Sequence, residues 1–287
     1  MLRISRFLAC VVIICTGHLL LTTIAGQEEQ TCDVANFEGW TLVSESKGQY
    51  KIKTYNKYIE NSPLLAFRGV AVMPLPIHQI LTVLSDASVA KEWVDLLVRM
   101  EMVTDPLSPS SADIQRKKTL DNEEDENYED FDKNDKEEET IVTSEIVYQY
   151  YGLPLFVSDR DFVFNRSWSF TPSTKRVIVD YQSIEGMTHL FTAEDSWTKR
   201  KNKGVIRAES PLTRWIFESF GEDATYVDVE TLVDNKGSLP AWLVNLIQGS
   251  WPYKTLSALQ KLSSQKERVS ASMKLNQVAE RVGVMNW

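Results

Sequence analysis

The pattern of apolar and polar residues predicts β-strands along most of the chain. The predicted strands are rich in β-branched and aromatic residues and are separated by turn residues such as Lys47-Gly48 and Asn61-Ser-Pro63. They span residues 41–44, 49–58, 64–73, 96–103, 141–150, 161–171, 176–183, 204–210, 213–220 and 224–233. We therefore expect a many-stranded antiparallel sheet.

Helical spacing replaces this pattern in two regions. After Pro76, apolar residues recur at three- and four-residue intervals up to Leu84, and a second short turn is expected over 87–93. A long helix begins at Pro240 and bends at Trp251-Pro252. Its apolar stripe, which should face the core or a ligand, consists of Trp242, Leu243, Leu246 and Ile247, followed by Leu256, Leu259 and Leu262.

This order of elements predicts an α+β domain in which a curved antiparallel sheet wraps around the last helix. Sheets of this kind leave a cavity between sheet and helix. We expect the domain to span residues 33–263, and residues 264–287 to form a C-terminal tail. An acidic segment, 105–140, is too charged and too poor in apolar residues to pack, so it is predicted to be a disordered insertion between two strands.

Candidate chemistry is concentrated in residues 158–170. Read as a strand, this stretch places Phe162, Phe164, Trp168 and Phe170 on one face, with Arg166 among them, while the other face is mostly polar. The aromatic face should point inward, where an unpaired charge costs roughly several kcal/mol. Arg166 therefore requires either an acidic neighbour or a polar group of a ligand.

Composition narrows the classes of partner. The formal net charge of −9 and the pI near 5.0 argue against nucleic acid, whose phosphates require a basic face. Outside the first 25 residues Cys32 is the only cysteine, so no intramolecular disulfide is expected there. The histidines and cysteines form no cluster, and we expect neither a metal site nor a cofactor.

Residues 1–25 predict a secretory signal peptide or a signal anchor. Arg3 and Arg6 precede an apolar run from Phe7 to Leu21, which is short for a spanning helix of about 20 residues and is interrupted by Thr16-Gly-His18. A cleaved signal is favoured, and either form predicts a secreted or lumenal protein of the secretory pathway. Asn165-Arg-Ser167 is then a possible glycosylation site.

Three segments, in this order, resemble the signature segments of START domains, the lipid-transfer domains related to the steroidogenic acute regulatory protein. They are Ser158-Asp-Arg-Asp-Phe-Val163, Lys203-Gly-Val-Ile-Arg-Ala-Glu209 and Thr231-Leu-Val-Asp-Asn-Lys-Gly-Ser-Leu-Pro-Ala-Trp-Leu-Val-Asn245. The resemblance covers roughly residues 40 to 263. It implies a helix-grip fold with an internal hydrophobic tunnel for one lipid, closed by the C-terminal helix, and no chemistry on the ligand. Most of the family works in the cytosol, whereas this chain begins with a predicted export signal.

The resemblance also implies an acid and an arginine inside the tunnel, which correspond here to Glu145 and Arg166. The geometry of a hairpin supports this pairing, because a loop from Gly152 to Asp159 pairs residues whose numbers add up to about 311, as those of Glu145 and Arg166 do. The pair would either anchor the polar end of a lipid or form a structural ion pair. For Arg160, Asp161, Arg207 and Glu209 a role in fixing strand ends is favoured over ligand contact.

We therefore expect a non-enzymatic lipid-binding or lipid-transfer protein that holds one sterol, phospholipid or ceramide-like lipid. It would act as a monomer in transient contact with membranes. The tunnel would be lined by Phe162, Phe164, Trp168, Trp242, Leu243, Leu246 and Ile247. Two alternatives remain open: a lipid-acting enzyme on the same fold, and a secreted interaction module that binds a basic partner through its acidic loop.

Overall fold

The computed structural model describes residues 38–47, 51–103, 115–118, 139–153, 157–184 and 204–265. The chain divides into two compact units, Met1–Glu38 and Gly39–Trp287, and the fold described below belongs to the second. The predicted signal at residues 1–25 and all but the first two residues of the predicted tail at 264–287 lie outside the described residues.

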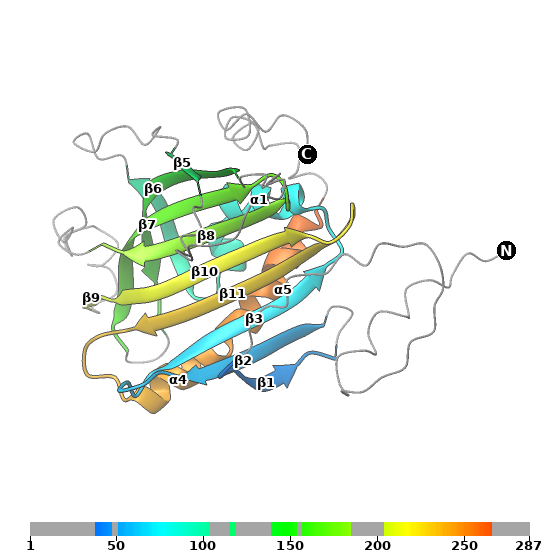
Figure 1. Cartoon of the computed structure of the whole chain (residues 1–287). Helices are drawn as coiled ribbons and strands as arrows, with labels where there is room; N and C mark the ends of the chain where they lie inside the picture. Colours follow the sequence, from blue (N-terminus) through cyan, green and yellow to red (C-terminus); the bar gives the residue numbers. More distant parts are fainter. Residues whose placement is uncertain are drawn as a thin grey trace, which may run out of the picture. The chain divides into compact units, whose positions relative to one another are not determined.

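One sheet contains all eleven strands of the described residues (Figure 1). Along it the strands are β1 (Thr41–Glu45), β2 (Ile52–Tyr58), β3 (Leu65–Met73), β11 (Thr225–Asp234), β10 (Glu209–Ser219), β8 (Arg176–Ser183), β7 (Asp159–Thr171), β6 (Glu139–Tyr151) and β4 (Leu97–Val103). Neighbours in this series are antiparallel. Off the series, β5 (Gln115–Lys118) pairs with β6, and β9 (Val205–Arg207) pairs in parallel with β7.

The helices pack on one face of this sheet. They are α1 (Ile77–Ser85), α2 (Ala90–Trp93), α4 (Ala241–Gly249) and α5 (Trp251–Ser263). The last helix contacts β2, β3 and the other three helices, so an antiparallel sheet packs against a long C-terminal helix, as predicted. The expected bend is also present, because α4 ends at Gly249 and α5 begins at Trp251-Pro252.

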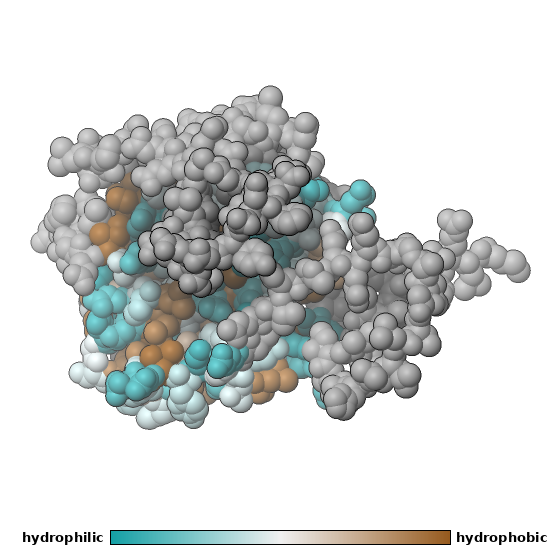
Figure 2. Space-filling view, viewed as in Figure 1, coloured by the Kyte–Doolittle hydropathy of each residue, from teal (hydrophilic) through white to brown (hydrophobic). Residues whose placement is uncertain are grey.

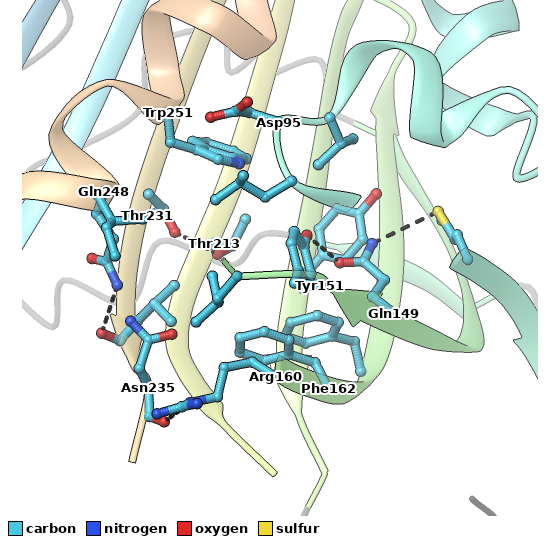
Figure 3. Close-up of a pocket in the computed structure, with 18 of the residues that line it drawn as sticks. Asp95, Gln149, Tyr151, Arg160, Phe162, Thr213, Thr231, Asn235, Gln248 and Trp251 are labelled. Atoms are coloured by element: carbon cyan, nitrogen blue, oxygen red, sulfur yellow. Dashed lines mark hydrogen bonds between the residues drawn. The ribbon is translucent and has the colours of Figure 1, made fainter. Parts of the chain in front are cut away.

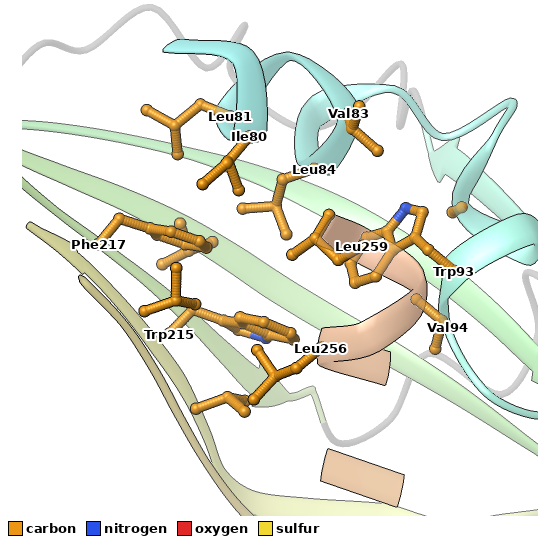
Figure 4. Packing of buried hydrophobic residues seen from close by; sticks show 14 of the residues in the cluster. Ile80, Leu81, Val83, Leu84, Trp93, Val94, Trp215, Phe217, Leu256 and Leu259 are labelled. Carbon is orange, nitrogen blue, oxygen red and sulfur yellow. The ribbon is translucent and has the colours of Figure 1, made fainter. Parts of the chain in front are cut away.

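The main hydrophobic core lies between the sheet and the helices. Leu256 and Leu259 of α5 and Leu84 of α1 converge there on Trp93 and Trp215 (Figure 4). The two tryptophan rings meet edge to face with their centroids 5.8 Å apart. Such aromatic contacts, together with the burial of these large side chains, fix the short α2 segment against the sheet.

A glycine allows α5 to approach β3 closely. A Cβ atom at Gly69 would lie 2.7 Å from Cβ of Pro252 and 2.8 Å from Cδ1 of Leu256. These distances are shorter than carbon atoms tolerate, so any larger residue at this position would push the helix away from the sheet.

The opposite face of the sheet carries a row of alternating charges. Asp180, Arg214, Glu230 and Arg68 are neighbours across β8, β10, β11 and β3. Arg214 Nε lies 2.7 Å from Asp180 Oδ1, and Arg68 Nη1 lies 3.4 Å from Glu230 Oε1. Over the coloured surface in Figure 2, hydrophilic and hydrophobic residues are accordingly interspersed.

Two predicted boundaries differ from the structure. The expected strands 204–210 and 213–220 are a short β9 and a long β10 that begins at Glu209, with a register shift between Glu209 and Leu212 around Pro211. In the segment 105–140, predicted to be disordered throughout, β5 pairs with β6, and β6 itself begins at Glu139. The other residues of that segment lie outside the described ones.

Candidate functional site

A cavity of about 100 Å³ lies between the sheet and the helices (Figure 3). Its walls come from the inner face of β6, β7, β8, β10 and β11, from the connection between α2 and β4, and from the facing sides of α4 and α5. Phe162 and Phe164, both predicted to line a tunnel, belong to this wall. The lining is predominantly apolar, as in pockets that bind small hydrophobic molecules.

Aromatic rings form one side of the cavity. The rings of Phe162 and Phe164 stack with centroids 5.2 Å apart, since residues two apart on a strand project from the same face. Tyr151 on β6 and Tyr181 on β8 meet these rings edge to face, at 5.4 and 5.6 Å. This packing makes a rigid apolar surface from three neighbouring strands.

Several polar side chains in the wall already have partners. The Tyr151 hydroxyl donates to Gln149 Oε1 at 2.8 Å, and the hydroxyls of Thr213 and Thr231 lie 2.9 Å apart. Burial raises the pKa of Tyr151 far above its ordinary value, so its hydroxyl is neutral and remains a donor. These pairs satisfy polar groups that would otherwise be costly to bury.

The guanidinium of Arg160, another polar group of the cavity wall, lies at the turn between β11 and α4. Arg160 at the start of β7 donates through Nε to the carbonyl oxygen of Asn235 and through Nη2, at 3.0 Å, to that of Lys236. Lys236 and Gly237 have φ values of 47° and 72°, so the chain turns sharply here and presents these carbonyls to the guanidinium. Burial lowers the pKa of Arg160 and the nearby charge of Asp159 partly offsets this, but a guanidinium remains protonated at neutral pH.

Glu145 and Arg166 face each other across β6 and β7, in the register that the hairpin geometry predicted. Arg166 is only 1% exposed and forms an ion pair with Glu145, which also accepts a hydrogen bond from Trp168 Nε1 at 3.0 Å. The Arg166 guanidinium lies over the rings of Trp168 and Tyr181, with Cζ 5.2 and 5.9 Å from their centroids.

Neither member of this pair lines the cavity, and Trp168 does not line it either. Tyr181 lies between the cavity and the ion pair, because it borders the cavity and its hydroxyl lies 3.5 Å from Arg166 Nη1. In this structure the pair is therefore an internal ion pair, and contact of Glu145, Arg166 or Trp168 with a ligand stays a prediction.

The predicted inward stripe of α4 is wrong for two residues. Trp242 and Leu246 are 68% and 66% exposed, whereas Val244 and Gln248 are buried. Ile247 lines the cavity, and Leu243 is half-buried outside it. Apolar residues surround almost the whole of this helix, so its hydrophobic pattern defines no unique face. Gln248 points inward because its Nε2 donates to the carbonyl oxygen of Val233 at 3.2 Å.

Other wall residues were missed, although a signal for some of them was present. Gln149 and Tyr151 share the face of β6 that carries Glu145. Because Glu145 pairs with the inward-facing Arg166, the same register places Gln149 and Tyr151 on the inner face of the sheet. Trp215 is likewise inward, with Thr213 two positions before it on β10. The residues expected to fix strand ends include Asp161 and Arg207, which pair at 2.9 and 3.0 Å.

Within the described residues, no helix is both long and apolar enough to cross a bilayer. In that same part of the chain, no three His, Cys, Asp or Glu side chains are grouped as metal ligands would be. The apolar loop 153–157 is described only in part; Leu153 is buried in the cavity wall.

Comparison with known proteins identifies relatives of the whole fold. The START domain model matches residues 25–252. An uncharacterised protein of Pseudomonas aeruginosa is 20% identical over 250 residues, which cover 87% of this chain and 99% of the relative.

Solved structures agree with this match. Human STARD10 superposes with a TM-score of 0.58 at 16% identity, over 83% of this chain and 78% of the other. A fragment of the STAR-related lipid transfer protein of Xanthomonas axonopodis superposes with a TM-score of 0.55 at 22% identity, over 79% of this chain and 99% of the fragment. At these identities the two structures establish a shared fold.

The burial of Arg166 predicts a strong dependence on Glu145. Glu145→Gln leaves the buried guanidinium without its counter-ion and should lower the free energy of unfolding by on the order of 3 kcal/mol. Combined with Arg166→Leu, the same change should cost much less, giving a coupling of at least about 1 kcal/mol in a double-mutant cycle measured by urea unfolding.

The exposed pair of Asp180 and Arg214 provides the matched control, with side chains 32% and 46% exposed. Asp180→Asn should cost less than about 1 kcal/mol. Equal losses from the two acids would contradict a special dependence of Arg166 on Glu145.

Proposed function

The chain belongs to the START domain family, and on this basis we propose that it is a non-enzymatic lipid-transfer protein that holds one lipid in the cavity described above. START domains bind lipids, and most of them are not enzymes. The observation that carries the proposal is the aromatic cavity between the sheet and the C-terminal helices, with polar side chains at a few positions. Sterols, phospholipids and ceramide-like lipids are the candidate ligands.

We propose that lipid enters the cavity by movement of part of its wall, and that α4 is the element that moves. It contributes Ile247 and Gln248 to the cavity. Its Asn245 accepts a hydrogen bond from Leu65 N at the start of β3, at 3.1 Å, and donates one to Pro63 O before it, at 3.3 Å. A small displacement of α4 would open the cavity beside α5 while leaving the core around Trp215 intact.

The same helix supports a proposal of transient membrane contact. Trp242 and Leu246 lie four residues apart and are both strongly exposed, and no residue from Ala241 to Gly249 carries a charge. Tryptophan and leucine on an uncharged helical face partition favourably into the boundary between lipid headgroups and acyl chains.

Filling the cavity should prevent lipid binding. Ile247→Trp adds an indole to the cavity wall, whereas Leu243→Trp adds the same group to a half-buried site of the same helix outside the cavity. Native mass spectrometry of the wild-type protein should show a monomer carrying one lipid. Ile247→Trp should lose this adduct, and Leu243→Trp should keep it.

A wild-type protein that takes up no lipid from any vesicle would overturn the proposed function. Loss of the adduct in both tryptophan variants would instead show that α4, rather than the cavity volume, is what binding depends on.

Removing the exposed apolar pair should slow lipid transfer without affecting lipid binding. Burying such a side chain contributes roughly 1.5–3 kcal/mol, so Trp242→Ser with Leu246→Ser should reduce the rate of transfer between vesicles by about tenfold or more. Lipid stoichiometry in native mass spectra should be unchanged. Phe220→Ser, which removes a 45% exposed aromatic residue just after β10, serves as the control and should leave the rate unaltered.

We also propose that the protein enters the secretory pathway, on the basis of the predicted signal at residues 1–25. Asn165 is exposed on β7, so its sequon is accessible there. Expression in a eukaryotic host should yield a secreted protein that begins near residue 26, and Asn165→Gln should remove any mass that an N-glycosidase removes. Retention of the full-length chain in the cytosol would contradict this proposal.

A further inference from the structure

Arg160 is a buried cation in the cavity wall that has no carboxylate partner within the described residues. Its side chain is 1% exposed. All of its hydrogen bonds there go to main-chain carbonyl oxygens, those of Asn235, Ser158, Lys236 and, at 3.5 Å, Asp159. Carbonyl dipoles solvate a charge but do not neutralise it, so Arg160 presents to this end of the cavity a cation that forms no ion pair with a carboxylate of the described residues.

The neighbouring acids form no ion pair with Arg160. Asp159 and Asp161 alternate with Arg160 along β7 and so project from the opposite face of the sheet. Asp159 accepts hydrogen bonds from the Tyr150 hydroxyl and the Leu153 amide, and Asp161 pairs with Arg207. The Asp161 charge is therefore balanced by Arg207, whereas Asp159 acts on Arg160 only through space and directs its carboxylate away from the cavity.

The other charges near the cavity are balanced. Asp95 also lines it, but its carboxylate lies 3.1 Å from Lys254 Nζ, and Figure 3 shows Asp95 and Arg160 at opposite ends of the residues drawn. Arg166 lies behind Tyr181 and is paired with Glu145. Among the described lining residues, Arg160 alone is charged and forms no ion pair.

Hydrogen-bonding capacity is left over at this end. A guanidinium has five N–H groups, and the bonds of Arg160 to carbonyls use at most four, which leaves one N–H of Nη2 without a partner in the described part of the chain. The side-chain amide of Asn235 lines the cavity next to Arg160 (Figure 3). Together they offer donors to an oxyanion.

We propose that the Arg160 end of the cavity binds the anionic group of a lipid, either the carboxylate of a fatty acid or the phosphate of a phospholipid. The apolar chains lie against the aromatic wall of Phe162 and Phe164, and the anion accepts hydrogen bonds from Arg160 and the Asn235 amide. This inference rests on the proposed lipid-binding function and narrows its ligand class to lipids with an oxyanion.

Matched lipid pairs test the preference directly on the full-length wild-type protein. Delipidated protein is offered equimolar oleic acid and oleyl alcohol, and separately dioleoyl phosphatidic acid and dioleoylglycerol, and bound lipid is counted by native mass spectrometry. Within each pair, the neutral lipid has the same hydrocarbon chains as the anionic one. We expect at least one anion to be bound about tenfold or more over its neutral counterpart, and the pair that shows the preference distinguishes carboxylate from phosphate.

Two variants locate the preference within the cavity. Asn235→Ala removes the side-chain amide but keeps the carbonyl that holds Arg160, so the fold is preserved and the preference should fall severalfold. Arg160→Gln should abolish the preference, so that the anionic lipid and its neutral counterpart bind equally. Arg214→Gln removes the same charge from the opposite face of the sheet and should have no effect.

Equal binding of the anionic and neutral lipids of each pair by the wild type would overturn this inference and leave the proposed function intact. An anion preference that survives in both Asn235→Ala and a folded Arg160→Gln would overturn it as well. Failure of the wild type to bind any of the four lipids would also overturn this inference, whereas only failure to take up every lipid, sterols and ceramides included, would count against the proposed function itself.

Discussion

The close approach of α5 to β3 at Gly69 is the constraint on which the rest of the domain depends. With no side chain between them, Pro252 and Leu256 rest almost directly on the strand, and this fixes one edge of the helix against the sheet. The separation then widens toward β7 and β8, where large aromatic residues from the sheet and Trp251 at the start of α5 border a space that they do not fill. The cavity therefore lies beside the closely packed contact of α5 with β3, in an otherwise close-packed interior.

Two arginines on the inner face of β7 illustrate different ways of placing a cation inside a protein. Arg166 has a carboxylate directly opposite on the neighbouring strand, reinforced by two aromatic rings, so its charge is balanced within the fold. Arg160 instead connects the start of β7 to the turn that leads into α4, because it donates hydrogen bonds to the carbonyls of Asn235 and Lys236 in that turn. The first arrangement stabilises a hairpin, while the second joins the sheet to the helix that closes the cavity and leaves its charge available.

The sequence predicted those features that depend on strand periodicity. Alternation along residues 158–170 identified the inward face of β7, and the hairpin geometry gave the register of Glu145 with Arg166. It failed where periodicity carries no information, as in α4, whose nearly uniform apolar composition conceals that Gln248 rather than Trp242 points inward. Cavity residues such as Thr213, Asn235 and Trp251 come from three separate elements, so only the folded arrangement, and no local pattern, brings them together.

The helix α4 has one side in the cavity wall, through Ile247 and Gln248, and another side in the solvent, through Trp242 and Leu246. Because both sides belong to one rigid element, a surface that binds the outer side also acts on the inner one. Thermodynamic linkage then requires reciprocity: the factor by which a bilayer changes affinity for the cargo equals the factor by which cargo changes affinity for the bilayer. On this helix, empty and loaded protein would distribute differently between membrane and solution.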